Sequence, residues 1–129
     1  MRKATPTLTG QELEIMKQIW KLKTATVRQV YEAMLEHRKI AYTTVMTMMN
    51  ILEQKGFLKK RAGERAFVYA PRRPERQVIR GMVREFLERV FNGAAEPLLV
   101  HLMEDERLTA TDLEEIRRTI RPAGGRKSQ

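Results

Sequence analysis

The pattern of hydrophobic and polar residues over the first 40 positions predicts two short helices. Thr9 is followed three residues later by Glu12, and this spacing is typical of a capping box at a helix N-terminus. Thr26 and Gln29 repeat the pattern and predict a second helix that ends near residues 36–38. The apolar residues that follow the two caps at helical spacing are Leu13, Met16, Ile19, Trp20, Val27, Val30, Met34 and Leu35.

Residues 41–56 predict a third helix that has two contrasting faces. Gly56 is placed to end this helix, since glycine readily adopts the left-handed backbone conformation that follows a last helical turn. At about 100° per residue, one side of the helix is apolar and the opposite side carries short polar residues. The apolar side contains Val45, Met48, Met49 and Leu52, and the polar side contains Thr43, Thr47, Asn50 and Gln54.

Two short strands are predicted after the third helix, over residues 57–61 and 66–70, with a glycine-containing turn at residues 62–65. Pro71 and Pro74 then close the domain. A polar-faced helix followed by a basic hairpin is the element order of a winged helix, in which the helix enters the major groove of DNA.

The second half of the chain predicts helices only. Residues 77–91 have an apolar stripe wider than a surface helix needs, and Thr109 with Asp112 resembles another capping box. The predicted fold class is therefore mainly α with a small β-hairpin. We expect an N-terminal winged helix-turn-helix in residues 1–74, a C-terminal helical dimerisation region in residues 75–121, and a disordered basic tail in residues 122–129.

The wide apolar stripe predicts a two-fold homodimer, because three short helices after a proline linker cannot bury it among themselves. The alternative is that these residues complete a core with the winged domain of the same chain. The residues expected in the dimer interface are Ile79, Met82, Val83, Phe86, Leu87, Val90, Phe91, Leu98, Leu102, Leu113 and Ile116.

The net charge of +9 arises in the first part of the 129-residue chain. Residues 1–74 contain 15 Lys and Arg against 6 Asp and Glu, whereas residues 75–129 contain 10 of each kind. A basic domain joined to a neutral one indicates a nucleic-acid-binding module and a separate protein-contact module. The chain has no cysteine, no membrane-spanning apolar run and no secretory pattern, which is consistent with a cytoplasmic protein.

The polar side of the third helix carries groups that read base edges. Thr43 and Thr47 each have a hydroxyl that donates or accepts and a methyl that contacts thymine, and Asn50 can bind adenine through two hydrogen bonds. This side has no arginine, so direct readout within one half-site is expected to be modest. The competing interpretation is a polar face that contacts only solvent, and the adjacent wing favours DNA reading.

Basic residues gather around the same helix in the sequence. Long cationic side chains bind phosphates without regard to base sequence, so they are expected to contact the DNA backbone. Tyr42 either contacts a phosphate through its hydroxyl or caps the hydrophobic core, whereas Phe67 and Tyr69 are expected to pack rather than to stack on bases. The expected phosphate contacts are Tyr42, Arg38, Lys39, Lys55, Lys59, Lys60, Arg61 and Arg65.

Four segments of the chain together resemble the penicillinase-repressor (BlaI/MecI/CopY) family of bacterial winged-helix regulators. They are LTGQELEIMKQIW, TVRQVYEAM, AYTTVMTMMNILEQKGFL and GERAFVYAP. The resemblance runs from about Leu8 to about Ile120, which is nearly the whole chain. The AYTTVMT run followed by LEQKGFL is much more specific than a generic helix-turn-helix pattern.

The resemblance implies a homodimeric repressor that binds an inverted-repeat operator in double-stranded DNA, with Thr43, Thr44 and Thr47 as contacts from the third helix. Resistance-type members are inactivated by proteolysis under the control of a membrane sensor, so an inactivating protease is an implied partner. The copper-responsive branch uses a C-terminal cysteine motif that this chain lacks. Ile51 stands where the family often has arginine and Met48 where it often has threonine, so the operator sequence is not implied.

No catalytic constellation, nucleotide-binding loop or metal-ligand spacing is visible in the sequence, so we expect no enzyme activity, no cofactor and no metal. The two histidines, His37 and His101, lie in different modules. Two other functions stay open, namely a winged helix that contacts proteins and a nucleic-acid-binding protein without sequence preference. The basic hairpin argues against the first, and competition by random duplex DNA would identify the second.

Overall fold

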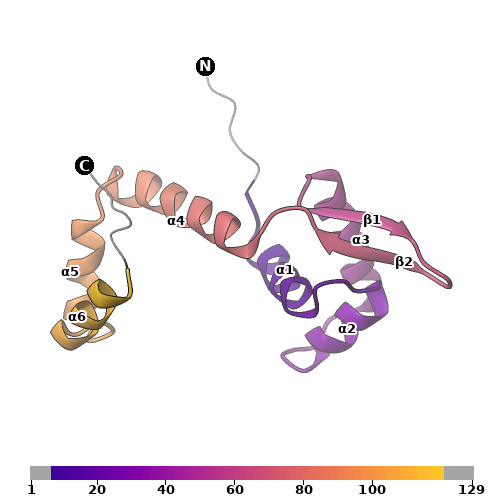
Figure 1. Ribbon diagram of the computed structural model, residues 1–129, viewed down its shortest axis with the longest axis horizontal. Coiled ribbons are helices and arrows are strands. Elements are labelled where there is room, and N and C mark those ends of the chain that lie inside the picture. Colours follow the sequence, from indigo (N-terminus) through magenta and orange to yellow (C-terminus); the bar gives the residue numbers. More distant parts are fainter. Residues whose placement is uncertain (1–6, 121–129) are drawn as a thin grey trace, which may run out of the picture. The chain divides into compact units, whose positions relative to one another are not determined.

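The computed structural model describes residues 7–120, so the predicted tail lies outside the described residues. Over this range the chain forms six helices and one antiparallel hairpin, which confirms the predicted fold class (Figure 1). The helices are α1 Gly10–Leu22, α2 Val27–Leu35, α3 Tyr42–Gln54, α4 Glu75–Phe91, α5 Glu96–Glu104 and α6 Ala110–Thr119, and the strands are β1 Leu58–Ala62 and β2 Phe67–Pro71.

The predicted capping boxes begin α1, α2 and α6. In the first of them, the Glu12 backbone N–H donates to Thr9 Oγ1 at 3.1 Å, and the Thr9 backbone N–H donates to Glu12 Oε1 at 2.9 Å. Each pair satisfies two backbone N–H groups that a helix N-terminus leaves without partners. Local sequence therefore determines where these three helices start.

Gly56 ends α3 as predicted, with a φ of +89°. The Gly56 N–H donates to the Glu53 carbonyl at 3.1 Å, and the Phe57 N–H donates to the Leu52 carbonyl at 2.9 Å. These two bonds form a Schellman motif, in which the residue after the glycine packs back on the last turn of the helix. Since Phe57 and Leu52 are both buried, the turn directs the chain from α3 straight into β1.

The two strands lie one residue later than predicted, with the turn at residues 63–66. Their antiparallel register places Lys60 opposite Tyr69. At the turn, the Gly63 N–H donates to the Ala66 carbonyl at 2.9 Å. A Cβ atom at position 63 would lie 2.5 Å from that carbonyl oxygen, so the turn requires glycine.

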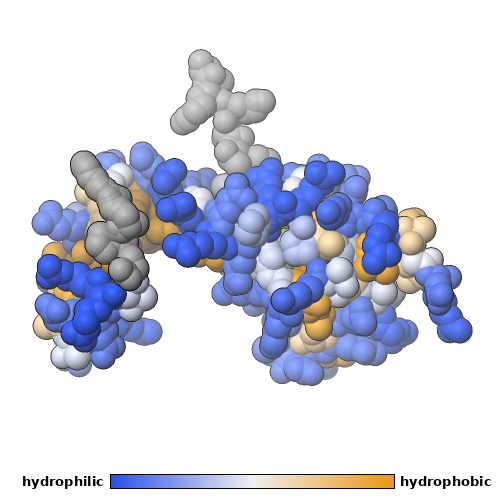
Figure 2. Space-filling model, viewed as in Figure 1, coloured by the Kyte–Doolittle hydropathy of each residue, from blue (hydrophilic) through white to orange (hydrophobic). Residues whose placement is uncertain are grey.

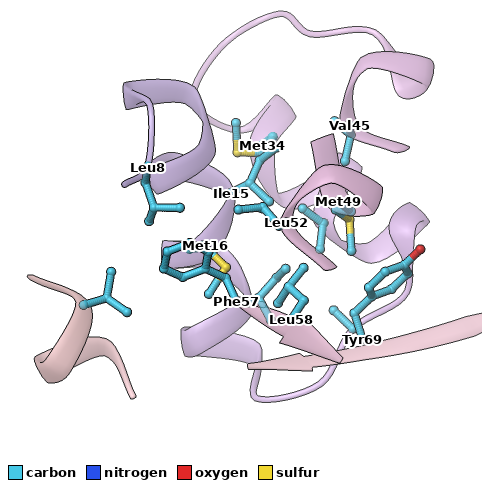
Figure 3. Packing of buried hydrophobic residues seen from close by; sticks show 14 residues of the cluster. Leu8, Ile15, Met16, Met34, Val45, Met49, Leu52, Phe57, Leu58 and Tyr69 are labelled. Carbon is cyan, nitrogen blue, oxygen red and sulfur yellow. The ribbon is translucent and has the colours of Figure 1, made fainter. Parts of the chain in front are cut away.

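One hydrophobic core is enclosed by α1, α2, α3 and the base of the hairpin (Figure 3). The predicted apolar faces supply most of it, although Leu35 is exposed and Met48 only half-buried because α2 and α3 bury narrower stripes than expected. The largest fully buried side chains are Ile15, Met16, Ile19, Met34, Met49, Leu52, Leu58, Val30 and Val45.

The first turns of α4 belong to this N-terminal core. Val78 is only 7% exposed, and Met82 packs against the same cluster. The Trp20 indole N–H also donates to the Arg73 carbonyl at 3.0 Å, which ties the segment before α4 to α1. The compact N-terminal unit therefore extends to residue 82, inside α4. Met82, expected in a dimer interface, contacts the core of its own chain.

The second compact unit begins at Val83, and among its described residues no side chain is fully buried. Phe91 contacts the Phe86 ring at a centroid distance of 6.0 Å and the His101 ring at 5.8 Å. Figure 2 shows hydrophobic surface among the hydrophilic residues of this unit. The large apolar side chains exposed here are Val83, Phe86, Val90, Leu99, Val100, Met103, Ile116 and Ile120.

Candidate nucleic-acid interface

The outward side of α3 combines hydroxyl groups with apolar side chains. Thr43 and Thr47 are exposed and Thr44 is half-buried, so the three threonines predicted to contact DNA border the solvent. Met46 and Ile51 are exposed beside them, although both are large apolar residues. Such a surface can bond base edges through its hydroxyls and contact thymine methyl groups through its apolar atoms. Met46 was not predicted in this surface, because at about 100° per residue it lies between the apolar side and the polar side of the helix.

Asn50, the fourth residue predicted to read bases, is half-buried at the edge of this surface. Its Oδ1 accepts a hydrogen bond from the Tyr69 hydroxyl of β2 at 3.0 Å. Its carboxamide oxygen is therefore directed at the hairpin. The sequence contains no signal for this bond, because the two residues are brought together only by the packing of β2 beside α3.

The start of α3 packs on α2 through aromatic rings. Tyr42 makes an edge-to-face contact with Tyr31 at a centroid distance of 5.3 Å, and the Arg28 guanidinium lies 5.8 Å from the Tyr42 ring centroid. The Tyr42 ring therefore packs on α2, and Tyr42 stays 38% exposed, so both roles considered for it, a phosphate contact and a cap on the core, stay predictions. Arg28 adds a cation beside the start of α3 that was not predicted, since only the packing of α2 on α3 places it there.

Two of the predicted phosphate ligands are engaged inside the domain. Lys55 Nζ lies 2.9 Å from Glu12 Oε1 and 3.1 Å from Oε2, and Arg38 Nε lies 3.0 Å from Glu14 Oε1. Burial by itself raises the pKa of the Glu12 carboxyl, but the Thr9 backbone hydrogen bond and the Lys55 ammonium outweigh it and hold the pKa below its ordinary value. Lys55 thus neutralises a buried carboxylate at the opposite end of α3 from Tyr42.

The hairpin cations, by contrast, make no salt bridge to any described residue. Lys60 shares a face with the aromatic residues of β2, and its Nζ lies 4.5 Å from the Phe67 ring centroid. Lys59 and Arg61 alternate onto the opposite face. Packing is confirmed for Tyr69, which is 2% exposed, and the same expectation was wrong for Phe67, which is 52% exposed near the tip of the hairpin.

The domain consists of three packed helices, the third with an exposed hydroxyl face, and a hairpin whose cations make no salt bridge to the described part of the chain. This arrangement defines a winged helix-turn-helix, a class of DNA-binding domain. Within the described residues, no group of three or more His, Asp or Glu is placed to hold a metal ion. None of the described helices combines the length and the apolar character needed to cross a membrane.

The chain belongs to the penicillinase repressor family, whose model matches residues 8–122. It is 28% identical to the penicillinase repressor of Bacillus licheniformis over 127 residues, which cover 98% of this chain and 99% of that protein. It is 32% identical to the transcriptional regulator BlaI of Mycobacterium tuberculosis over 111 residues, which cover 84% and 79% of the two chains. The predicted family is thereby confirmed.

A solved structure of the DNA-binding domain of the repressor BlaI aligns with a TM-score of 0.51 and 32% sequence identity. The alignment covers 57% of this chain and 90% of that domain. The protein is therefore a winged-helix DNA-binding transcriptional regulator of the repressor type.

Proposed function

We propose that the protein is a homodimeric repressor that occupies an inverted-repeat operator in duplex DNA, with α3 of each chain in a major groove. The single observation that carries the proposal is the exposed threonine face of α3 beside a hairpin whose cations have no partner among the described residues. The relatives named above as repressors support it. The protein has no proposed enzymatic role.

Base reading is assigned to Thr43, Thr44 and Thr47 through their hydroxyl and methyl groups, with Met46 and Ile51 available to contact thymine methyls. Apolar contacts and single hydrogen bonds discriminate bases less strongly than a bidentate arginine does. The proposal therefore places much of the specificity in the requirement for two correctly spaced half-sites.

Backbone binding is assigned to cations that the domain leaves unpaired. On the hairpin and before α3 these side chains are free of salt bridges to described residues, and they fix the position of the domain on the duplex. Lys55 and Arg38 are removed from this group because carboxylates already hold them. The proposed phosphate contacts are Lys39, Lys59, Lys60, Arg61 and Arg65, with Tyr42 at the start of α3. Arg28 lies beside Tyr42 but is left out of this group, because its guanidinium pairs with Glu32 at 3.6 Å.

Dimerisation is assigned to the C-terminal unit, because its apolar side chains find no closed core within the described part of one chain. An equal number of acidic and basic residues over 75–129 lets two copies approach without net repulsion. We also propose that an inactivating protease acts on this chain, as implied by the resemblance to resistance-type repressors. Cutting the C-terminal unit would separate the two DNA-binding domains and lower operator affinity.

The proposal is tested with purified protein and the duplex found upstream of its own coding sequence, since we expect such a repressor to control its own expression. Fluorescence anisotropy should show operator binding at least about 1,000-fold tighter than binding to random duplex. The logarithm of the affinity should fall linearly with the logarithm of the salt concentration. Equal binding to both duplexes would show a non-specific protein, and no binding at low salt would favour a protein-contact role.

Base reading and phosphate binding are separated by a pair of variants. Thr47→Ala should weaken operator binding by about 1 kcal/mol and leave random-duplex binding nearly unchanged, because it removes one hydrogen bond to a base edge. Lys59→Ala should weaken both duplexes alike and lower the salt slope by about one. Lys17→Ala, an exposed lysine of α1, is the control. Equal losses on both duplexes for Thr47→Ala would remove Thr47 from the reading surface.

A further inference from the structure

We propose that Asn50 and Tyr69 form a strut between α3 and the hairpin, so that Asn50 positions the wing instead of reading a base. The inference deepens the proposed function and rests on it, since the wing is assigned to phosphate binding. The juxtaposition that carries it is the 3.0 Å hydrogen bond from the Tyr69 hydroxyl to Asn50 Oδ1.

Tyr69 connects three parts of the domain: its backbone bonds to Ala25, its ring lies in the core and its hydroxyl bonds to Asn50. Its backbone N–H donates to the Ala25 carbonyl at 2.8 Å, and its carbonyl accepts from the Ala25 N–H at 2.9 Å. These bonds fasten the middle of β2 to the segment between α1 and α2. The ring lies at the edge of the core, with the hydroxyl oxygen directed away from the other labelled side chains (Figure 3). The hydroxyl then reaches α3 through Asn50.

The Tyr69 hydroxyl is a stable donor in this hydrogen bond, and Asn50 Oδ1 is the acceptor. Burial raises the pKa of Tyr69, and the nearby Glu53 carboxylate adds to the shift, so the hydroxyl stays protonated and donates. Tyr69 is almost entirely buried, so breaking the bond would leave its hydroxyl without a hydrogen-bond partner, and this loss costs free energy. Two-point pairing with adenine needs Oδ1 and Nδ2 of Asn50 to face the groove together. Because Oδ1 accepts the hydrogen bond from Tyr69, the carboxamide of Asn50 does not direct both atoms at the groove.

The strut matters because the hairpin has only two strands. Such a ribbon is marginally stable by itself and needs packing against another element to keep its direction. Lys60 Nζ lies 5.9 Å from the Tyr69 ring centroid, so this hairpin cation stands on the same face as the strut. The bond from Tyr69 to α3 therefore fixes the spacing between the base-reading helix and the phosphate-binding cations in the free protein. This lowers the entropy that the hairpin and its cations lose when the protein binds DNA.

The experiment compares Tyr69→Phe, Asn50→Ala and the double variant of the full-length protein on operator and random duplex. Each single change should weaken binding to both duplexes about fivefold and lower the salt slope, because the wing phosphate contacts lose their alignment. The double variant should bind no worse than either single variant, since both remove the same bond. Tyr31→Phe is the matched control, because the Tyr31 hydroxyl makes no side-chain hydrogen bond to a described residue.

A base-reading Asn50 would give a different result. Asn50→Ala would then weaken binding to the operator but not to random duplex, and the loss would depend on the identity of one base pair in the operator. The affinity would fall by the same factor whether Asn50→Ala is made in the wild type or in Tyr69→Phe. Wild-type binding by Tyr69→Phe would also overturn the strut. If Tyr69→Phe does not fold, Asn50→Ala with operator and random duplex decides the question by the same criteria.

A readout without DNA separates this inference from the proposed function. Amide hydrogen exchange of the hairpin in the free protein should be faster in Asn50→Ala and Tyr69→Phe than in wild type, while the amides of α1 keep their protection. Unchanged hairpin exchange overturns the strut whether or not the protein prefers an operator. Faster exchange in a protein that shows no operator preference would uphold the strut and refute the repressor function.

Discussion

The two compact units use the same local signals but differ in where their apolar faces are buried. Capping boxes begin α1 and α2 in the first unit and α6 in the second. In the first unit the apolar faces meet within one chain and close a core. In the second unit the described residues leave large apolar side chains in solvent. Helix-forming sequence is therefore not sufficient to close a core within the described part of one chain.

The contrast between the two units predicts that a Leu→Ala substitution lowers the free energy of unfolding much more in the first unit than in the second. This is the largest effect that we expect. Leu52→Ala removes a fully buried side chain of α3 and should lower the free energy of unfolding by about 2–5 kcal/mol. Leu99→Ala, at a residue 37% exposed in α5, should cost less than about 0.5 kcal/mol within one chain. Urea denaturation at several protein concentrations measures both.

The concentration dependence sharpens this test. Loss of stability in Leu52→Ala should be the same at every protein concentration, since the core belongs to one chain. The cost of Leu99→Ala should appear only where dimers form. If Leu99→Ala were as costly as Leu52→Ala at all concentrations, the second unit would close a core of its own and the contrast would fail.

A second prediction concerns the proposed interface directly. Phe86→Asp places a carboxylate among the exposed apolar residues of α4 and should weaken dimerisation by about 2 kcal/mol or more, giving monomers at micromolar concentration. Sedimentation equilibrium measures the association. Arg84→Asp is the control, because it introduces the same carboxylate at an exposed polar position of the same helix. A dimer that persists in Phe86→Asp would place the interface elsewhere.

A smaller effect is expected from the ion pair that joins α1 to the end of α3. Glu12→Gln keeps the capping-box acceptor but removes the charge held by Lys55, and it should cost about 1 kcal/mol at neutral pH. Because the pKa of Glu12 is lowered in the folded protein, its contribution is present above its ordinary pKa and is lost as the pH falls through the folded value.

Unfolding free energies of wild type and Glu12→Gln should therefore differ by a constant amount near neutral pH and converge as the pH falls through the lowered pKa of Glu12. Glu14→Gln is the control, since Glu14 pairs with Arg38 at a half-exposed site and should change stability by only a few tenths of a kcal/mol. A difference between wild type and Glu12→Gln that stays constant down to pH 3 would show that the charge of Glu12 is not what stabilises the fold.

Much of the fold was predictable because its signals are local. A capping box spans four residues, and the glycine that ends α3 acts within one turn, so Thr9, Thr26 and Gly56 mark their elements without reference to the rest of the chain. The site was predictable only in part. Polar spacing identified Thr43 and Thr47 as an outward pair, and they are exposed. The same spacing grouped Asn50 with them, although it faces the hairpin.

The sequence by itself determined the helix starts, the glycine turns, the basic first half and the family, since each depends on neighbouring residues or on composition. Tertiary structure alone decided which charges are free and which polar groups are engaged. Lys55 meets Glu12, Asn50 meets Tyr69, and Arg28 approaches Tyr42 across helix contacts that no local spacing encodes. The physical reason is that packing the apolar faces sets the distances between residues far apart in the chain, and electrostatic and hydrogen-bond energies depend on those distances.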